Sequence, residues 1–136
     1  MQTNNLTDTK TSQTALTVLL VEDDSLISSV LEYLFVRHGF VVKVAIDGLA
    51  AQAIIQSNEA PPDIAVFDLM LPYLDGYELL QLTKKQPTWA KVPIIVLSGK
   101  AQEEDAVRAF KLGASDYIVK PFQPNELIAR ILRLTN

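Results

Sequence analysis

The sequence predicts an α/β fold in which helices cover both faces of a five-stranded parallel sheet. Short apolar runs of strand length recur along the chain, and segments with apolar residues at helical spacing separate them. Most of these runs are continuously apolar rather than alternating, as expected for strands buried on both faces. The length of 136 residues and the apolar content of 49% suit a single domain with a full core.

The first part of the domain begins with a strand at 16–21, LTVLLV, followed by a helix that ends near Gly39. Five apolar residues of this helix follow helical spacing: Ile27, Val30, Leu31, Leu34 and Phe35. The second strand, 41–45, is more polar, which places it near an edge of the sheet. A short helix begins after Asp47, and its apolar face comprises Leu49, Ala50, Ala53 and Ile54.

A pair of prolines breaks the chain before a third strand at 63–68, DIAVFD. Asp75 stands three residues before Glu78, which is the spacing of a capping box and predicts the start of a third helix. Pro87 ends that region. The domain therefore continues its alternation of strand and helix.

The last part repeats the same pattern, with a strand at 92–98, a helix at 101–112 and a fifth strand at 115–120. Pro124 fits the first turn of a final helix, whose buried stripe comprises Leu127, Ile128, Ile131 and Leu132. Five strands and five helices in alternation predict a doubly wound (βα)5 domain over 15–136, with the flavodoxin-like strand order 2-1-3-4-5. The polar segment 1–14 is expected to be a flexible tail.

The composition excludes several classes of protein and site. The chain has no cysteine and one histidine, which excludes disulfides, thiolate chemistry and multi-histidine metal sites. The net charge of −4 argues against direct binding of nucleic acid. No apolar run approaches the roughly 18 residues that span a membrane, and the N-terminus lacks a signal-peptide core. We therefore expect a cytoplasmic protein without membrane association.

Polar side chains stand where four of the predicted strands end. These residues are Glu22 and Asp23, Asp68, Ser98, and Lys120. The carboxyl ends of parallel strands meet at one edge of a doubly wound sheet, which is where such folds bind ligands. We therefore expect three carboxylates, a hydroxyl and an ammonium group to converge there.

Three ionised carboxylates so close together repel one another unless a cation joins them. A site with only oxygen ligands favours Mg²⁺. Together with Lys120 and Ser98, such a site suits a phosphoryl group, and Asp68 is the predicted nucleophile that carries it.

The chain resembles a receiver domain of a two-component response regulator. The resemblance implies a chemotaxis-receiver-like fold. Four stretches carry the resemblance: VLLVEDD (18–24), DLMLPYLDG (68–76), VLSGK (96–100) and GASDYIVKPF (113–122). The stretches DYIVKPF and NELIAR further resemble receivers of the winged-helix transcription-factor branch. Each stretch alone has little specificity, but the set in this order and spacing is highly specific.

The resemblance implies a role for each residue of the site. Asp68 is the implied phosphoacceptor, and Mg²⁺ is bound by Asp23, Asp68 and the backbone carbonyl of Met70, with Glu22 acting through water. Lys120 contacts the acyl phosphate. Ser98 and Tyr117 stand at the positions of the switch hydroxyl and the switch aromatic residue.

The resemblance also implies the partners. A sensor histidine kinase or a phosphotransfer protein donates the phosphoryl group, and the face built from 101–112, 115–120 and the last helix contacts a downstream protein or an output domain. A weak phosphorylation-dependent homodimer is expected through Arg108, Asp116 and Arg130, with Asp116 and Arg130 meeting across a two-fold axis. Ala106 stands where that branch has the basic partner of Glu126. The chain is either a stand-alone regulator or a fragment of a larger one.

Two other functions fit part of the pattern. A metal-dependent phosphatase shares the aspartyl-phosphate chemistry, but the sequence shows neither a cap domain nor a second carboxylate placed as a general acid. An inactive docking module requires the loss of Asp23, Asp68 or Lys120, and all three are present. We therefore expect a phosphoacceptor rather than a conventional enzyme. Asp24 is interpreted as a residue that caps or precedes the first helix, and Asp47 and Asp75 are interpreted as caps or turn residues.

Overall fold

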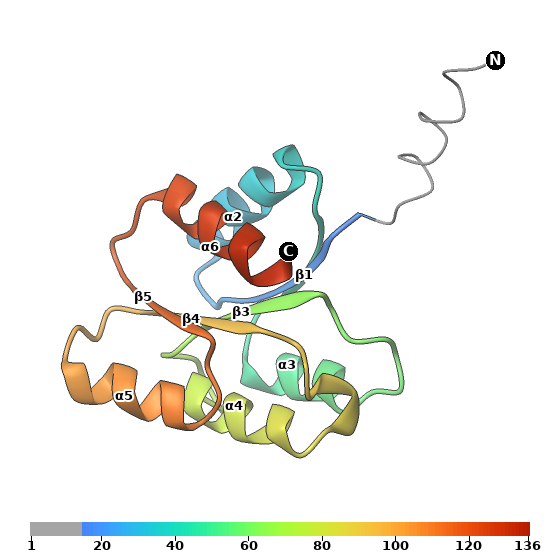
Figure 1. The fold of residues 1–136 in the computed structure, drawn as a ribbon, viewed down its shortest axis with the longest axis vertical. Helices are drawn as coiled ribbons and strands as arrows, with labels where there is room; N and C mark the ends of the chain where they lie inside the picture. The colour runs from blue at the N-terminus through green and yellow to red at the C-terminus, as the bar shows by residue number, and fades with distance from the viewer. Residues whose placement is uncertain (1–14) are drawn as a thin grey trace.

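A computed structural model describes residues 15–136, and the tail predicted at 1–14 lies outside them. Five parallel strands form one sheet in the order β2-β1-β3-β4-β5 (Figure 1), which confirms the predicted fold. The strands are β1 (Thr17–Val21), β2 (Val41–Ala45), β3 (Ile64–Asp68), β4 (Ile94–Ser98) and β5 (Asp116–Val119).

Helices cover both faces of this sheet, with α2 and α6 on one side and α3, α4 and α5 on the other (Figure 1). Their bounds are α2 (Ser25–Arg37), α3 (Gly48–Ile55), α4 (Gly76–Lys84), α5 (Glu103–Lys111) and α6 (Pro124–Thr135). The segment after Pro87 is a short 3-10 helix, η1 (Pro87–Trp89), rather than a plain break. None of the helices in residues 15–136 has the length and apolar content to cross a membrane.

The core consists of two apolar clusters, one on each face of the sheet. Leu19 and Val21 of β1 pack on the side of α3 and α4, whereas Val18 and Leu20 pack on the side of α2 and α6. Both sets are almost fully buried, which explains why β1 is apolar at each position from Val18 to Val21. The edge strand β2 is exposed at alternate positions, in agreement with its more polar sequence.

Aspartates cap three helices that begin at the carboxyl edge of the sheet, α2, α3 and α4. Asp24 accepts backbone hydrogen bonds at the start of α2, and Asp47 does so at the start of α3. Asp75 and Glu78 form the predicted capping box at the start of α4. These contacts satisfy backbone N–H groups that would otherwise lack partners, and they fix the loops that surround the strand ends.

Candidate functional site

Three carboxylates meet at the carboxyl edge of the sheet, as the sequence predicts. Glu22 and Asp23 follow β1, and Asp68 ends the neighbouring strand β3. One carboxylate oxygen from each lies within 4.8 Å of the others. Glu22 and Asp68 are 1% and 5% exposed, whereas Asp23 is open to solvent. The site is therefore a buried acidic pair with one accessible carboxylate beside it.

Lys120 reaches this cluster from the end of β5. Its Nζ donates to Glu22 Oε1 at 3.1 Å and to Asp68 Oδ2 at 3.2 Å. Burial alone lowers the pKa of Lys120, but the charges of Asp68 and Glu22 outweigh it and raise the pKa above its ordinary value. Lys120 therefore stays protonated, and its one ammonium group contacts two of the three carboxylates.

The surroundings of Glu22 disfavour its ionised form. Burial raises its pKa to about 7, with the hydrogen bond and charge of Asp68 adding to the rise. The backbone N–H of Asp24, which donates to Glu22 Oε2 at 3.2 Å, and Lys120 oppose it only in part. A cluster of hard oxygen donors that cannot keep all its charges without a further cation fits Mg²⁺.

Glu22→Gln is expected to stabilise the metal-free protein by on the order of 1–3 kcal/mol above pH 7 and to change it little near pH 4. The folded protein binds the Glu22 proton more tightly than the unfolded chain does, so protonation of Glu22 adds to the free energy of unfolding. This contribution is complete below pH 4.5 and is lost as the pH rises through about 7. Glutamine resembles the protonated acid at every pH.

Urea unfolding in EDTA at pH 4 and pH 8 measures this difference. Glu59→Gln is the control, because Glu59 is an exposed carboxylate whose partner is the exposed Lys43. Equal stability of Glu22→Gln and the parent at pH 8 would contradict the expectation.

Ser98 and Tyr117 both hold the backbone of Lys100, in the loop between β4 and α5. Ser98 Oγ accepts from the Lys100 N–H at 2.9 Å, and the Tyr117 hydroxyl donates to the Lys100 carbonyl at 2.8 Å. Ser98 is fully buried, while Tyr117 is half-buried. The sequence predicts that these two residues lie near each other, but it does not indicate that both form hydrogen bonds with the backbone of the same loop residue.

Met70 is the second residue after Asp68, the candidate phosphoacceptor. Its backbone N–H donates to Asp68 Oδ1 at 3.2 Å, and its side chain is exposed. The Lys120–Pro121 peptide is cis. Residues 68–70 thus form a tight turn beside the acidic cluster, and the role of the Met70 carbonyl stays a prediction.

The residues expected at an interface have partners within the same chain. Arg130 Nη1 donates to both carboxylate oxygens of Asp116 at 2.8 Å, and Arg133 Nη2 donates to Asp116 Oδ2 at 3.1 Å. Arg130 also pairs with Glu126 at 3.0 Å. Sequence reasoning missed Arg133, although its position three residues after Arg130 places both on one side of α6. The pair expected to form across a two-fold axis is thus an internal contact between β5 and α6.

Arg108 is also engaged internally. Its guanidinium lies 3.9 Å from the ring centroid of Tyr77, a residue of α4. The Tyr77 hydroxyl donates to the Asp105 carbonyl at 3.2 Å and so joins α4 to the first turn of α5. Tyr77 was not a candidate from the sequence, because only the packing of the two helices reveals its contacts.

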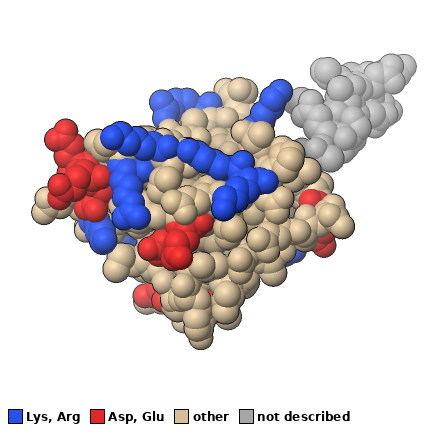
Figure 2. Space-filling model, turned by 90° about the horizontal axis from the view of Figure 1, so that it is seen from below, with Lys and Arg blue, Asp and Glu red and all other residues tan. Residues whose placement is uncertain are grey.

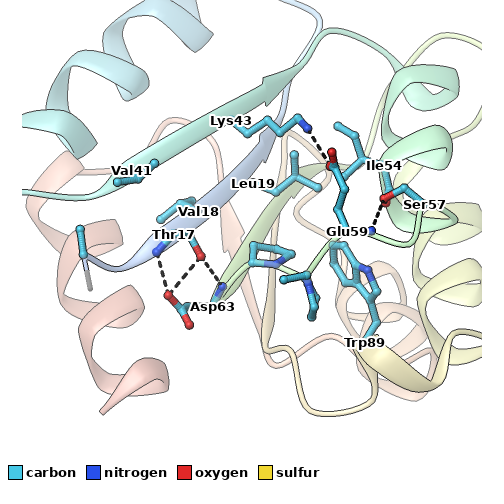
Figure 3. A pocket seen from close by; sticks show the side chains of 14 residues that line it. Thr17, Val18, Leu19, Val41, Lys43, Ile54, Ser57, Glu59, Asp63 and Trp89 are labelled. Atoms are coloured by element: carbon cyan, nitrogen blue, oxygen red, sulfur yellow. Dashed lines mark hydrogen bonds and ion pairs between the residues drawn. The ribbon is translucent and has the colours of Figure 1, made fainter. Parts of the chain in front are cut away.

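A separate cavity of about 430 Å³ opens at the opposite, amino-terminal end of the sheet (Figure 3). Hydrogen bonds between Thr17 and Asp63 and the ion pair of Lys43 with Glu59 lie along it, and Trp89 forms part of its lining. The carboxylates and Lys120 are at the other end of the strands. This cavity is therefore not the predicted site.

Comparisons with known proteins match almost the whole described chain. The family model for the response regulator receiver domain matches residues 18–132. The chain is 38% identical over 114 residues to the phosphate regulon transcriptional regulatory protein PhoB of Klebsiella pneumoniae, covering 84% of this chain and 49% of that protein. It is 33% identical over 117 residues to the DNA-binding dual master transcriptional regulator RpaA of Synechocystis. This match covers 86% of this chain and 48% of that protein. The chain spans about half the length of the curated relatives it matches.

Solved structures give the same result. The receiver domain of the Francisella response regulator 1452 is 37% identical with a TM-score of 0.81, and the match covers 88% of this chain and 96% of that one. The receiver domain of a sensor histidine kinase from Pseudomonas aeruginosa PAO1, solved with a magnesium ion coordinated in its active site cleft, is 30% identical with a TM-score of 0.81. That match covers 90% of this chain and 98% of that one.

Proposed function

This chain belongs to the response regulator receiver domain family, and we propose that it is a phosphorylation-dependent signalling switch whose phosphoacceptor is Asp68. One observation carries the proposal: Asp68, Glu22 and Asp23 lie together at the ends of β3 and β1, and Lys120 donates to two of these carboxylates. Asp68 is the residue of this set that ends the central strand of the sheet.

In the proposed reaction, an Asp68 carboxylate oxygen attacks the phosphorus of a phosphohistidine or a small acyl phosphate. The new O–P bond forms as the bond to the donor breaks, and the donor keeps the electron pair. Asp23, Asp68 and the Met70 carbonyl would hold Mg²⁺, and Glu22 would act on it through a water molecule. The ion supplies charge neutralisation for the phosphoryl oxygens. Lys120, already 3.2 Å from Asp68 Oδ2, turns to the phosphoryl group.

The switch step follows from the shared contacts of Ser98 and Tyr117. A Ser98 hydroxyl that turns to the phosphoryl group no longer accepts from the Lys100 N–H. The loop is then held at Lys100 only by the Tyr117 hydroxyl, and a shift of Lys100 releases that bond too. Tyr117 leaves its half-buried position, and the face of α5, β5 and α6 changes its surface. A downstream protein, an output domain or a second copy of the chain recognises the changed surface.

An apolar groove next to the site supports a protein as the phosphoryl donor. It measures about 500 Å³ and runs between α2 and the segment after Lys120, with Leu26, Val30 and Phe122 in its lining. Leu26 and Val30 are four residues apart on α2 and are 73% and 53% exposed, so the groove has apolar side chains open to solvent. A helical phosphohistidine protein, either a sensor histidine kinase or a phosphotransfer protein, fits an apolar groove beside Lys120.

The proposal is tested by incubating the protein with acetyl phosphate. We expect the intact mass to rise by about 80 Da in the presence of Mg²⁺, one phosphoryl group, and not to rise in EDTA. Release of inorganic phosphate from p-nitrophenyl phosphate distinguishes the alternative, since steady turnover of that substrate indicates a phosphatase. A mass that is unchanged under both conditions contradicts the proposed function.

The phosphorylated protein is expected to lose its phosphate faster when Met70 and Lys100 are both replaced by Ala, by about threefold or more in rate. The backbone N–H groups of Met70 and Lys100 donate to the Asp68 and Ser98 side chains, and we infer that the side chains of these two residues hinder the attacking water. The rate is measured from the decay of the added mass after the donor is removed. Lys91→Ala, an exposed lysine two residues after Trp89, is the control. An unchanged or slower decay in the double variant contradicts this expectation.

A further inference from the structure

The helices leave part of the sheet uncovered at its amino-terminal edge. In β1, Thr17 and Leu19 lie on the side of the sheet that faces α3 and α4. Val41 and Lys43 of β2 are their partners in register, so they lie on the same side. The short helix α3 packs near Ala45, which is 1% exposed, but it leaves Val41 57% exposed. The cavity of about 430 Å³ is the space over this uncovered part (Figure 3).

The segment that closes this cavity, residues 57–63, is held at both ends by hydrogen bonds. Ser57 Oγ donates to the Ile54 carbonyl at the end of α3, at 2.8 Å. At the other end, Asp63 Oδ2 accepts from the Thr17 N–H at 2.8 Å, and the Asp63 N–H donates to the Thr17 carbonyl at 3.0 Å. Two prolines between these ends restrict the backbone further. This wall of the cavity is therefore in place before any ligand binds.

The interior of the cavity is mostly apolar. Its apolar lining comprises Leu19, Val41, Ile54, Trp89 and the two prolines. Trp89 is 3% exposed, and Figure 3 shows its indole among the lining side chains. The volume lies within the range of small-molecule pockets, roughly 300–1,000 Å³. The cavity can therefore accept an apolar group of the size of a leucine or phenylalanine side chain.

Two opposite charges stand at the solvent side of the cavity. Lys43 Nζ lies 3.4 Å from Glu59 Oε1, and the two side chains are 58% and 71% exposed. A pair so exposed contributes little to stability, so a ligand can replace it at low cost. The third charged side chain among the lining residues, Asp63, is already engaged by Thr17. A ligand thus meets one available ammonium group and one available carboxylate, side by side.

We propose that this cavity binds a free α-amino acid with a large apolar side chain. Such a molecule carries an ammonium group and a carboxylate on one carbon, so its carboxylate contacts Lys43 while its ammonium group contacts Glu59. The apolar side chain fills the space between the sheet and Trp89. The ligand is neutral as a whole, which suits the side of α3, α4 and α5, because Figure 2 shows basic and acidic side chains next to one another there.

This site is separate from the acidic cluster. Asp63 precedes β3 and Asp68 ends it, so the two lie about 16 Å apart along the strand. The residues that line the cavity include none of the predicted phosphorylation site. Binding is therefore measured without Mg²⁺ or a phosphoryl donor, and its failure and the failure of the proposed function are separate results.

Fluorescence of Trp89 tests the proposal directly, because it is the one tryptophan of the chain and it lines the cavity. We expect L-phenylalanine or L-leucine to change the emission saturably. L-Phenylalanine should bind at least about tenfold more tightly than 3-phenylpropionate, which lacks the ammonium group, and than phenethylamine, which lacks the carboxylate. No saturable change with either amino acid, or equal affinities for the three phenyl compounds, overturns the proposal.

Substitutions at the two charges test which group each one binds. Glu59→Gln should lower the preference for L-phenylalanine over 3-phenylpropionate, and Lys43→Gln the preference over phenethylamine, each at least about fivefold. Lys111→Gln removes an exposed lysine of α5 and should leave both preferences unchanged. Preferences that stay at the parent's values in Glu59→Gln and Lys43→Gln overturn the proposal.

A cavity-filling variant tests the place of the apolar side chain. Val41→Phe puts a larger ring into the space over the sheet, and it should weaken binding of L-phenylalanine and L-leucine at least about tenfold. Val41 is exposed, so the fold tolerates the larger side chain, and circular dichroism confirms this. Unchanged affinity in a folded Val41→Phe places the ligand elsewhere and overturns the proposal.

Discussion

Asp68→Asn is expected to abolish phosphorylation by acetyl phosphate, lowering the amount of phosphoprotein at least about tenfold. The amide of asparagine is a poor nucleophile, while its size and shape are those of aspartate. The variant also removes one carboxylate from a cluster in which Glu22 and Asp68 repel each other, so it should fold at least as well as the parent. Intact mass after incubation with Mg²⁺ and acetyl phosphate measures the difference.

Asp24→Asn is the matched control for this loss. Asp24 is close to the site, since its backbone N–H donates to Glu22, but its side chain caps α2 by accepting from the N–H groups of Leu26 and Ile27. Asparagine caps a helix about as well as aspartate. The control should therefore be phosphorylated like the parent. Phosphorylation of Asp68→Asn to the same extent would show that another residue is the acceptor.

The strand ends made the site predictable from the sequence. In a parallel sheet, neighbouring strands bring their carboxyl ends to the same edge, so Glu22, Asp68 and Lys120 converge whatever the details of the loops. The caps at Asp47 and Asp75 were predictable for a similar reason, because the capping contacts join residues only three apart. Local and topological rules of this kind need no knowledge of side-chain packing.

The partners of side chains at helix interfaces were not predictable in the same way. Asp116 was expected to meet Arg130 of a second copy, but the packing of α6 against β5 brings the two together within one chain. Tyr77 binds Asp105 and Arg108 because α4 and α5 lie side by side. These contacts depend on the distance and rotation between two elements, which periodicity does not determine.

Some helices and strands begin or end at other residues than the sequence predicts, and the reasons are local. The fourth strand was expected to begin at residue 92 but begins at Ile94, because Pro93 has no N–H for the ladder and offers only its carbonyl, which accepts from Ala65. The helix expected at 101–112 is α5, Glu103–Lys111, with Gln102 as its N-terminal cap position. The shifts are one or two residues, and Asp68 and Ser98 are still the last residues of their strands.

Asp23→Asn is expected to weaken Mg²⁺ binding at least about tenfold, and more than Glu22→Gln does. Both carboxylate oxygens of Glu22 are already engaged, one by Lys120 and one by the Asp24 N–H. The Asp23 side chain is exposed and, within the described residues, makes no hydrogen bond or ion pair that a metal would have to replace. Asp23 is therefore the carboxylate best placed to enter the coordination sphere directly.

Isothermal titration calorimetry measures these affinities. Fluorescence of Trp89 is poorly suited, because this side chain lines the cavity at the opposite end of the sheet (Figure 3). Asp24→Asn should bind Mg²⁺ like the parent, since that side chain is occupied in capping α2. If Asp23→Asn keeps the affinity of the parent while Glu22→Gln loses it, the order of the two residues around the metal is the reverse of the one proposed. The buried Glu22 would then have to exchange its contact with Lys120 for the metal, at the cost of separating an ammonium and a carboxylate that lie 3.1 Å apart.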